Sequence, residues 1–426
     1  MKLKLIWNIL IILLFSFYFN PPTVNADWST YRVSPNSAVP SYPQLAVSDS
    51  GYAVVWVDDR ISNSDLYFAP INIIAGKIIQ VGKEQRITNN AVHDLTPALV
   101  WNGHDFGIFW SYDKSSIYFS RINKHGKKIV NDISIGVKSK GYAIHVSAVW
   151  NGQEYGVTWW DVRDAPACTP PGTRGRAFFA RVDIEGRMIG EEIPVSDAFS
   201  NPWQDYKPLI VWDGENYAIF WGDSRENGEC AGGVGDIYMA IVNRNGEKIL
   251  GDIKLQSNEL SPQLWDVEWD GENYAIGYNG RIGQADLAKM DINGNTILVD
   301  VPINSTGQGG YPMITSYDNK YYLAWNDFRD RTPETFYNNE IYYTSTDKDG
   351  NKLIPETRLT FYDQPSTEQT PIMFYKGNMG IAWIDSKDST PQVYFASNLA
   401  NYPKLSKPQK PPKPSISIPR PIRPLH

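Results

Sequence analysis

The chain has 426 residues, a formal net charge of −7, and unusually many tryptophans (15) and tyrosines (25). With 33 glycines and 29 prolines, this composition favours aromatic-rich strands joined by tight turns over helices. Residues 1–26 contribute two positive charges and residues 403–426 contribute six, so residues 27–402 carry about −15. A body this acidic repels phosphate backbones, which excludes nucleic acid as the expected partner.

The N-terminal segment has the features of a secretory signal peptide. Lys2 and Lys4 precede an apolar run, Leu5–Phe19, and small residues at Val24–Ala26 mark a predicted cleavage site. The run is short for a membrane span, so we expect a cleaved signal over residues 1–26 rather than an anchor. The predicted location is secreted, periplasmic or cell-surface, with no transmembrane segment in the mature protein.

Seven related segments follow, each ending in an aromatic anchor residue. The anchors are Trp56, Trp110, Trp159, Trp221, Tyr278, Trp325 and Trp383, at intervals of 54, 49, 62, 57, 47 and 58 residues. Periods of this size are typical of arrays in which each unit buries its faces only against its neighbours. The octapeptide WDGENYAI occurs in two units, at Trp212–Ile219 and Trp269–Ile276. We attribute this duplication to architecture rather than to chemistry.

Each unit predicts four antiparallel strands. A short apolar strand leads through an Asn/Asp/Gly turn to the strand that ends at the anchor. A third strand then ends three residues before a glycine, as at Asn123 and Gly126, and a fourth strand follows. Seven such units predict an all-β fold, a seven-bladed β-propeller over residues 27–402. The last unit stops after its third strand near Ala400, so we expect Ser29–Ser37 to supply the fourth strand and close the ring.

The units resemble β-propeller repeats of secreted microbial proteins, with a W-x-D-x-R core followed by an aromatic strand. The Asp and the basic residue stand two and four positions after the anchor in five units: Asp58/Arg60, Asp161/Arg163, Asp223/Arg225, Asp327/Arg329 and Asp385/Lys387. The resemblance covers residues 29–400 and implies the fold and an extracellular setting, but no activity. Because a catalytic group is normally needed once, five copies favour blade-stabilising ion pairs, with part of a ligand rim as the alternative.

One face of the propeller is the predicted binding face. The second-to-third connections expand at Asp161–Arg176, Gly222–Asp236 and Asn326–Glu340, on the same face as the crossovers between blades. Function tends to lie on variable loops held by a rigid frame, and aromatic rings beside polar groups suit sugars. The crossover aromatics include Tyr42, and the predicted ligand-binding residues are Trp203, Tyr206, Trp265, Tyr311, Tyr362, Asp223, Arg225, Asp327 and Arg329.

Two cysteines occupy equivalent positions in neighbouring units. Cys168 and Cys230 each follow an anchor tryptophan by nine residues. In a secreted chain this placement predicts a disulfide that ties two loops of the binding face, with two free thiols as the alternative.

No cofactor or metal site is predicted. The five histidines lack ligand spacing, and the DKDGN segment at Asp347–Asn351 lacks the remaining acids of a calcium loop.

Residues 403–426 contain eight prolines, six Lys or Arg and no acid. This composition predicts an extended basic tail, either a solvated spacer or a contact to anionic envelope polymers.

Three function classes remain open at this point. The first is a secreted or cell-surface binding module for carbohydrate or an extracellular protein. The second is a glycan-processing hydrolase or lyase with carboxylates at the channel mouth, for which Glu226, Glu229, Asp330 and Glu334 are further candidates on the enlarged loops. The third is a structural envelope component. An enzyme should present one unrepeated acid cluster, whereas a lectin-like module should present similar aromatic-polar pockets in several blades.

Overall fold

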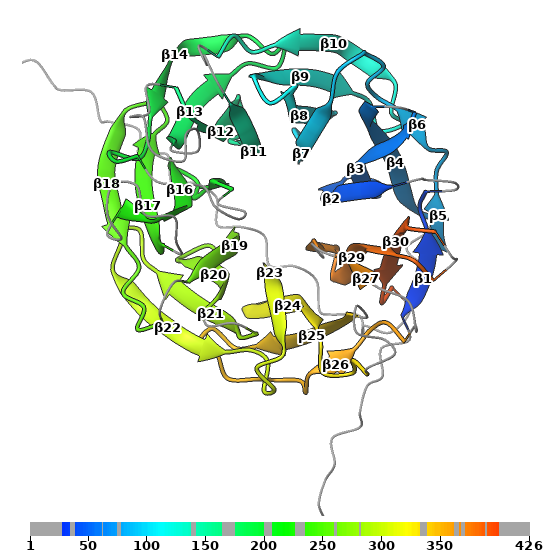
Figure 1. The fold of residues 1–426 in the computed structure, drawn as a ribbon, viewed down its shortest axis with the longest axis vertical. Coiled ribbons are helices and arrows are strands. Elements are labelled where there is room, and N and C mark those ends of the chain that lie inside the picture. The colour runs from blue at the N-terminus through cyan, green and yellow to red at the C-terminus, as the bar shows by residue number, and fades with distance from the viewer. Residues whose placement is uncertain are drawn as a thin grey trace, which may run out of the picture.

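The computed structural model describes most of the predicted propeller. The described residues are 28–34, 39–61, 63–74, 78–137, 142–163, 175–199, 207–225, 235–259, 262–280, 283–332, 339–361, 366–367, 371–387 and 390–399. They form seven antiparallel sheets arranged in a ring, which confirms the seven-bladed β-propeller (Figure 1). No helix in these residues is long and apolar enough to cross a membrane.

The first strand of each blade lies nearest the central channel and the fourth lies on the rim (Figure 1). Blade 1 contains β2 (Pro40–Ser48), β3 (Gly51–Ile61), β4 (Asn63–Ile74), β5 (Ile78–Val81) and β6 (Gln85–Arg86). Blade 2 contains β7 (Asp94–Trp101), β8 (Phe106–Tyr112), β9 (Ser116–Ile122) and β10 (Lys128–Ser134). Blade 3 contains β11 (Ala143–Trp150), β12 (Tyr155–Asp161), β13 (Arg176–Val182) and β14 (Met188–Pro194). Blade 4 contains β15 (Leu209–Trp212), β16 (Asn216–Asp223), β17 (Asp236–Asn243) and β18 (Lys248–Lys254). Blade 5 contains β19 (Gln263–Trp269), β20 (Tyr274–Asn279), β21 (Ala285–Met290) and β22 (Thr296–Pro302). Blade 6 contains β23 (Gly309–Tyr317), β24 (Lys320–Asp327), β25 (Glu340–Thr346) and β26 (Thr357–Arg358). Blade 7 contains β27 (Ser366–Thr367), β28 (Ile372–Tyr375), β29 (Asn378–Asp385), β30 (Gln392–Ser397) and β1 (Ser29–Arg32).

The ring is closed by the N-terminal strand, as predicted. β1 pairs antiparallel with β30, from Ser29 opposite Ser397 to Arg32 opposite Tyr394. The strand ends at Arg32, earlier than the predicted Ser37, although the backbone N–H of Val33 still donates to the carbonyl of Val393 at 2.8 Å. This pairing covers the edge of β30, which would otherwise be an unpaired strand edge.

The core lies between blades rather than within them. Val55 and Phe68 of blade 1 belong to the same buried cluster as Ile108 and Trp110 of blade 2. All seven anchor aromatics are fully buried. A blade therefore buries its faces only when its neighbours are present, as expected of a repeat array.

The W-x-D-x-R residues form a layered contact inside each blade. In blade 6 the indole Nε1 of Trp325 donates to Asp327 Oδ2 at 2.8 Å, and the backbone N–H of Arg329 donates to Asp327 Oδ1 at 2.9 Å. The guanidinium of Arg329 bonds the same carboxylate at 2.6 Å, bonds Glu356 at 2.6 Å, and lies 4.4 Å above the ring of Tyr342. Corresponding Trp–Asp and Asp–Arg bonds occur in blades 1, 3 and 4. These contacts fit the blade-stabilising interpretation of the motif.

Blade 2 departs from this motif and keeps the same layering by other means. Trp110 Nε1 donates instead to Asp94, which lies on the first strand, at 2.7 Å. The ring of Tyr112 stacks on Tyr118, with centroids 4.1 Å apart, where blades 1, 3, 4, 6 and 7 place a guanidinium or ammonium group. An aromatic ring therefore substitutes for the cation in this blade.

The duplicated octapeptide connects neighbouring blades. Asp213 accepts the backbone N–H groups of Glu215 and Asn216 at 2.8 and 2.6 Å, which closes the turn between β15 and β16. Its other oxygen accepts the hydroxyl of Tyr274, from the second copy in blade 5, at 2.7 Å. The tyrosine of the second copy thus donates a hydrogen bond to the aspartate of the first copy. This contact gives a physical reason for the same sequence in adjacent blades.

Candidate functional site

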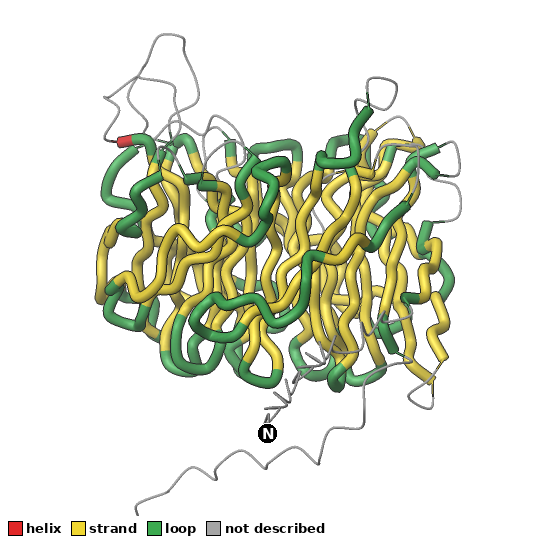
Figure 2. The backbone as a smooth tube through the Cα atoms, turned by 90° about the horizontal axis from the view of Figure 1, so that it is seen from below, coloured by secondary structure: helices red, strands yellow, loops and turns green. Residues whose placement is uncertain are grey.

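The predicted binding face is built by the strand topology. Within each blade the first strand begins opposite the end of the second, as Pro40 lies opposite Asp58 and Ala143 opposite Asp161. The connections between second and third strands therefore share one face with the crossovers between blades; we call this the connection face. The opposite face carries short turns such as Asn102–Asp105 and Asn123–Lys127. Figure 2 shows the strands running between the two faces.

The innermost strands are bent where they enter the connection face. β2, β7, β11 and β23 each have a register shift at their start, with Tyr42, Thr96, His145 and Tyr311 at positive φ of 51°, 47°, 58° and 63°. Such bulges re-aim side chains, and left-handed backbone at non-glycine residues costs about 1–3 kcal/mol each. Because the same backbone strain occurs at equivalent positions in four blades, we infer that the direction of the side chains at this end of the channel is important for function.

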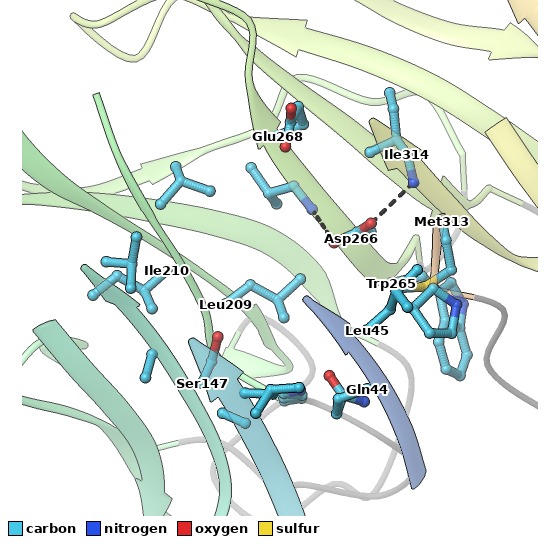
Figure 3. Close-up of a pocket in the computed structure, with 18 of the residues that line it drawn as sticks. Gln44, Leu45, Ser147, Leu209, Ile210, Trp265, Asp266, Glu268, Met313 and Ile314 are labelled. Atoms are coloured by element: carbon cyan, nitrogen blue, oxygen red, sulfur yellow. Dashed lines mark hydrogen bonds between the residues drawn. The ribbon is translucent and has the colours of Figure 1, made fainter. Parts of the chain in front are cut away.

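A cavity of about 300 Å³ occupies the channel and extends from this end along the innermost strands. Residues from the innermost strands of all seven blades line it, and most of them are apolar (Figure 3). The polar and aromatic exceptions include His145, Lys207, Trp265, Asp266 and Glu268. These five residues come from blades 3, 4 and 5, and we call them the mouth cluster.

Both acids of the mouth cluster are bonded to the inner strands of blades 5 and 6. Asp266 accepts the backbone N–H of Val267 at 3.0 Å and that of Ile314 on β23 at 2.9 Å (Figure 3). Glu268 Oε1 accepts the backbone N–H and the hydroxyl of Ser316 at 3.3 and 3.1 Å. Because β23 is innermost in its blade, its channel-side N–H groups have no strand partner, and these carboxylates supply the acceptors.

Burial perturbs the titration of both acids. Burial in the channel raises the pKa of Asp266 to about 7, against the effect of its two backbone hydrogen bonds and of the Lys207 charge. Burial also raises the pKa of Glu268 to about 7, and the neighbouring Asp266 charge acts in the same direction. Each acid is therefore divided between its protonated and ionised forms near neutral pH.

The cation of the cluster has no hydrogen-bond or ion-pair partner among the described residues. Lys207 makes no hydrogen bond or ion pair with any described residue, and its interaction with Asp266 is through space. Burial lowers the pKa of Lys207 to about 8, while the Asp266 charge opposes this. Burial, together with the Lys207 charge, lowers the pKa of His145 to about 4. At pH 7 the lysine is mostly charged and the histidine is neutral.

An aromatic pair borders the cluster. The rings of Trp265 and Tyr311 meet edge to face, with centroids 4.4 Å apart and an interplanar angle of 89°. Trp265 Nε1 is buried and has no hydrogen-bond partner among the described residues. An unsatisfied buried indole N–H is uncommon, and it calls for an acceptor from water or from a ligand.

The structure treats the predicted site residues in three ways. It brings Trp265 and Tyr311 together at the channel mouth. It places the Asp/Arg pairs of blades 4 and 6 (Asp223, Arg225, Asp327 and Arg329) in contacts within their own blades and away from the cavity lining. Asp330 accepts the hydroxyl of Tyr342 at 2.7 Å. The predictions for Trp203, Tyr206, Tyr362, Glu226, Glu229, Glu334 and the Cys168–Cys230 disulfide concern residues outside the described ranges.

Sequence reasoning missed His145, Lys207, Asp266 and Glu268. One signal was present: where the first strands of blades 2 and 4 have the apolar residues Ala98 and Leu209, blade 5 has Asp266 at the equivalent position. The same strand carries a second acid two residues later, in a segment that is apolar elsewhere. An acid pair on a channel-facing strand could therefore have been identified by comparing the repeats.

The comparisons with known proteins give a fold likeness only. No family model matches the chain, and no curated protein matches it. A Trypanosoma rangeli sialidase structure is 8% identical with a TM-score of 0.49, covering 87% of this chain and 58% of that one. A subtype N10 neuraminidase-like protein of A/little yellow-shouldered bat/Guatemala is 8% identical with a TM-score of 0.46, covering 87% and 96%. A prolyl endopeptidase structure is 11% identical with a TM-score of 0.46, covering 84% and 50%. Likeness at this level assigns no activity.

Proposed function

We propose that this protein is a secreted or cell-surface binding module that holds carbohydrate at the channel mouth on the connection face. The proposal depends on one observation: side chains whose hydrogen-bond donors lack a described acceptor lie near aromatic rings at the edge of one cavity. Lys207 and the Trp265 indole N–H have no partner among the described residues, and the ring of Trp265, which packs against Tyr311, lines the same cavity. Sugars offer apolar ring faces and hydroxyl edges, and a mostly apolar pocket with a few convergent polar groups is typical of ligand sites.

A second candidate, a glycan-processing hydrolase or lyase, is favoured by one observation. Asp266 and Glu268 form an acid pair in the channel, with Glu268 farther from the mouth near the end of β19, and their raised pKa values allow one to be protonated while the other is ionised. The hydrogen bonds to the amides of Ile314 and Ser316 weigh against this candidate, because they occupy the carboxylates in a structural role. Binding without turnover is therefore the primary proposal.

One assay separates these candidates. The full-length mature protein is applied to soluble and insoluble polysaccharides, and retention is scored together with the release of reducing or unsaturated ends. Retention without product, weakened at least several-fold by Trp265→Leu, supports the binding module. Trp212→Leu is the matched control, because Trp212 is another partly buried inner-strand tryptophan and lies at the opposite end of its strand. Product release that Glu268→Gln abolishes would transfer the proposal to the enzyme, and neither result would leave an extracellular protein as the partner to test.

A further inference from the structure

The side chains at the channel mouth that lack hydrogen-bond partners differ chemically from those that have them. Both acids of the mouth cluster already accept main-chain N–H groups. Three side chains of the cluster have no described hydrogen-bond partner: Lys207 and Trp265 present only donors, whereas the neutral imidazole of His145 presents one donor and one acceptor. A ligand that pairs with Lys207 and Trp265 must therefore bring acceptors, and the ammonium favours an acceptor that carries negative charge.

We propose that the ligand unit at the channel mouth is a carboxylate-bearing sugar, a hexuronate, whose carboxylate pairs with Lys207 beside the Trp265–Tyr311 rings. This inference rests on the proposed carbohydrate binding and specifies its chemistry. The carboxylate meets the ammonium, a ring or hydroxyl oxygen accepts from the Trp265 indole N–H, and the sugar ring packs against the aromatic wall. The cavity of about 300 Å³ lies at the lower end of the usual range for ligand pockets, which suits one sugar unit of a chain.

The charges around Lys207 determine how such binding depends on pH. The titratable groups of the elements packed about it are His145 on β11, Asp266 and Glu268 on β19, and the Tyr42 phenol on β2. At pH 6 the lysine is charged, the histidine is neutral and most of the acid is protonated, so the site is net positive. At pH 8.5 the acids are ionised and much of the lysine is neutral, so the site is net negative. Hexuronate affinity should therefore fall as pH rises from 6 to 8.5, whereas affinity for an uncharged sugar should change little.

The test measures binding by the full-length mature protein with isothermal titration calorimetry. The probes are the methyl glycosides of glucuronic and galacturonic acid, the matching neutral methyl glucoside and galactoside, and sodium acetate, each at pH 6.0 and 8.5. We expect at least one uronide to bind about 10-fold or more tightly than its neutral counterpart at pH 6.0, since a charge-assisted hydrogen bond is lost in the latter. We expect that preference to disappear at pH 8.5.

Substitutions assign the effect to the lysine. Lys207→Met keeps an unbranched side chain that is one atom shorter and removes its charge, so it should abolish the uronide preference while leaving neutral-sugar binding in place. Lys207→Arg should retain more of the preference at pH 8.5 than the wild type does, because its cation does not titrate in this range while the two acids still ionise. Lys127→Met, at an exposed turn on the opposite face, is the matched control and should behave as the wild type.

Each outcome distinguishes this inference from the proposed function. Equal binding of uronides and neutral sugars, unaffected by Lys207→Met, overturns the inference and leaves carbohydrate binding standing. Acetate binding as tightly as the uronides overturns the sugar component of the inference. No binding of any glycoside, together with no polysaccharide retention, overturns both.

Discussion

Substitution of Glu268 tests how much a charged carboxylate buried in the channel lowers the free energy of unfolding. Its side chain lies in the channel, and only Oε1 accepts the N–H and hydroxyl of Ser316. Glu268→Gln keeps an oxygen for those two bonds and places an uncharged amide where Oε2 was. The substitution therefore removes the charge while leaving the described hydrogen bonds in place.

The magnitude follows from the raised pKa. The pKa of Glu268 in the folded protein, about 7, lies above the ordinary value of 4.5 for a glutamate. A carboxyl with a raised folded pKa contributes stability that is fully present below pH 4.5 and is lost as pH rises to 7. The shift corresponds to about 3 kcal/mol at most, and channel water reduces it, so we expect about 1–3 kcal/mol. Glu268→Gln should match the wild type at pH 4 and exceed its free energy of unfolding by that amount at pH 8.

Urea denaturation followed by tryptophan fluorescence and circular dichroism, at pH 4, 6 and 8, measures the difference. Other titrating groups cancel to first order because each comparison is made at one pH. Glu272→Gln, in the exposed turn before β20, is the control and should show no pH-dependent difference. A Glu268→Gln variant that differs from the wild type by the same amount at all three pH values, or that is less stable at pH 8, would refute the reasoning.

Three further predictions concern the frame. Tyr274→Phe removes the bond to Asp213 between blades 4 and 5 and should lower the free energy of unfolding by about 1–3 kcal/mol, measured by urea denaturation. Asp327→Ala leaves Trp325 Nε1 without its acceptor and breaks a buried ion pair, so it should cost about 2–4 kcal/mol, yet polysaccharide retention should persist in the folded fraction. Deleting Ser29–Arg32 exposes the edge of β30 and should lower the melting temperature and promote association, measured by calorimetry and size-exclusion chromatography.

Controls make each of these results decisive. Tyr142→Phe alters an exposed tyrosine and should leave stability unchanged, so an equal loss in both tyrosine variants would contradict the role given to Tyr274. Loss of retention in folded Asp327→Ala would restore the ligand-rim interpretation of the W-x-D-x-R residues. A deletion variant that melts like the wild type and stays monomeric would show that ring closure does not depend on β1.

The frame of this protein was predictable because its determinants are local and repeated. The anchor at Trp325 and the polar residues after it predict a strand end and its internal bonds, and the recurrence of the pattern predicts the number of blades. The missing fourth strand of the last unit also predicted closure by Ser29–Ser37, of which Ser29–Arg32 form the strand. Periodicity and turn chemistry act within one blade, so one sequence suffices to recognise them.

The site could be predicted only in part. The aromatic pair Trp265 and Tyr311 was expected on the binding face, but Lys207, Asp266 and Glu268 were not. Their sequence neighbours give no chemical motif, because the lysine and the acids stand about 60 residues apart on different blades. They meet only when the innermost strands converge on the channel.

Sequence therefore determined the repeat, the blades and the closing strand, and tertiary structure decided the chemistry of the channel. A carboxylate on a strand is an ordinary surface group until neighbouring blades remove water from it. Once the ring closes, burial raises the pKa of Asp266 and Glu268 and lowers that of Lys207. Desolvation depends on every blade at once, and no local pattern in the chain encodes it.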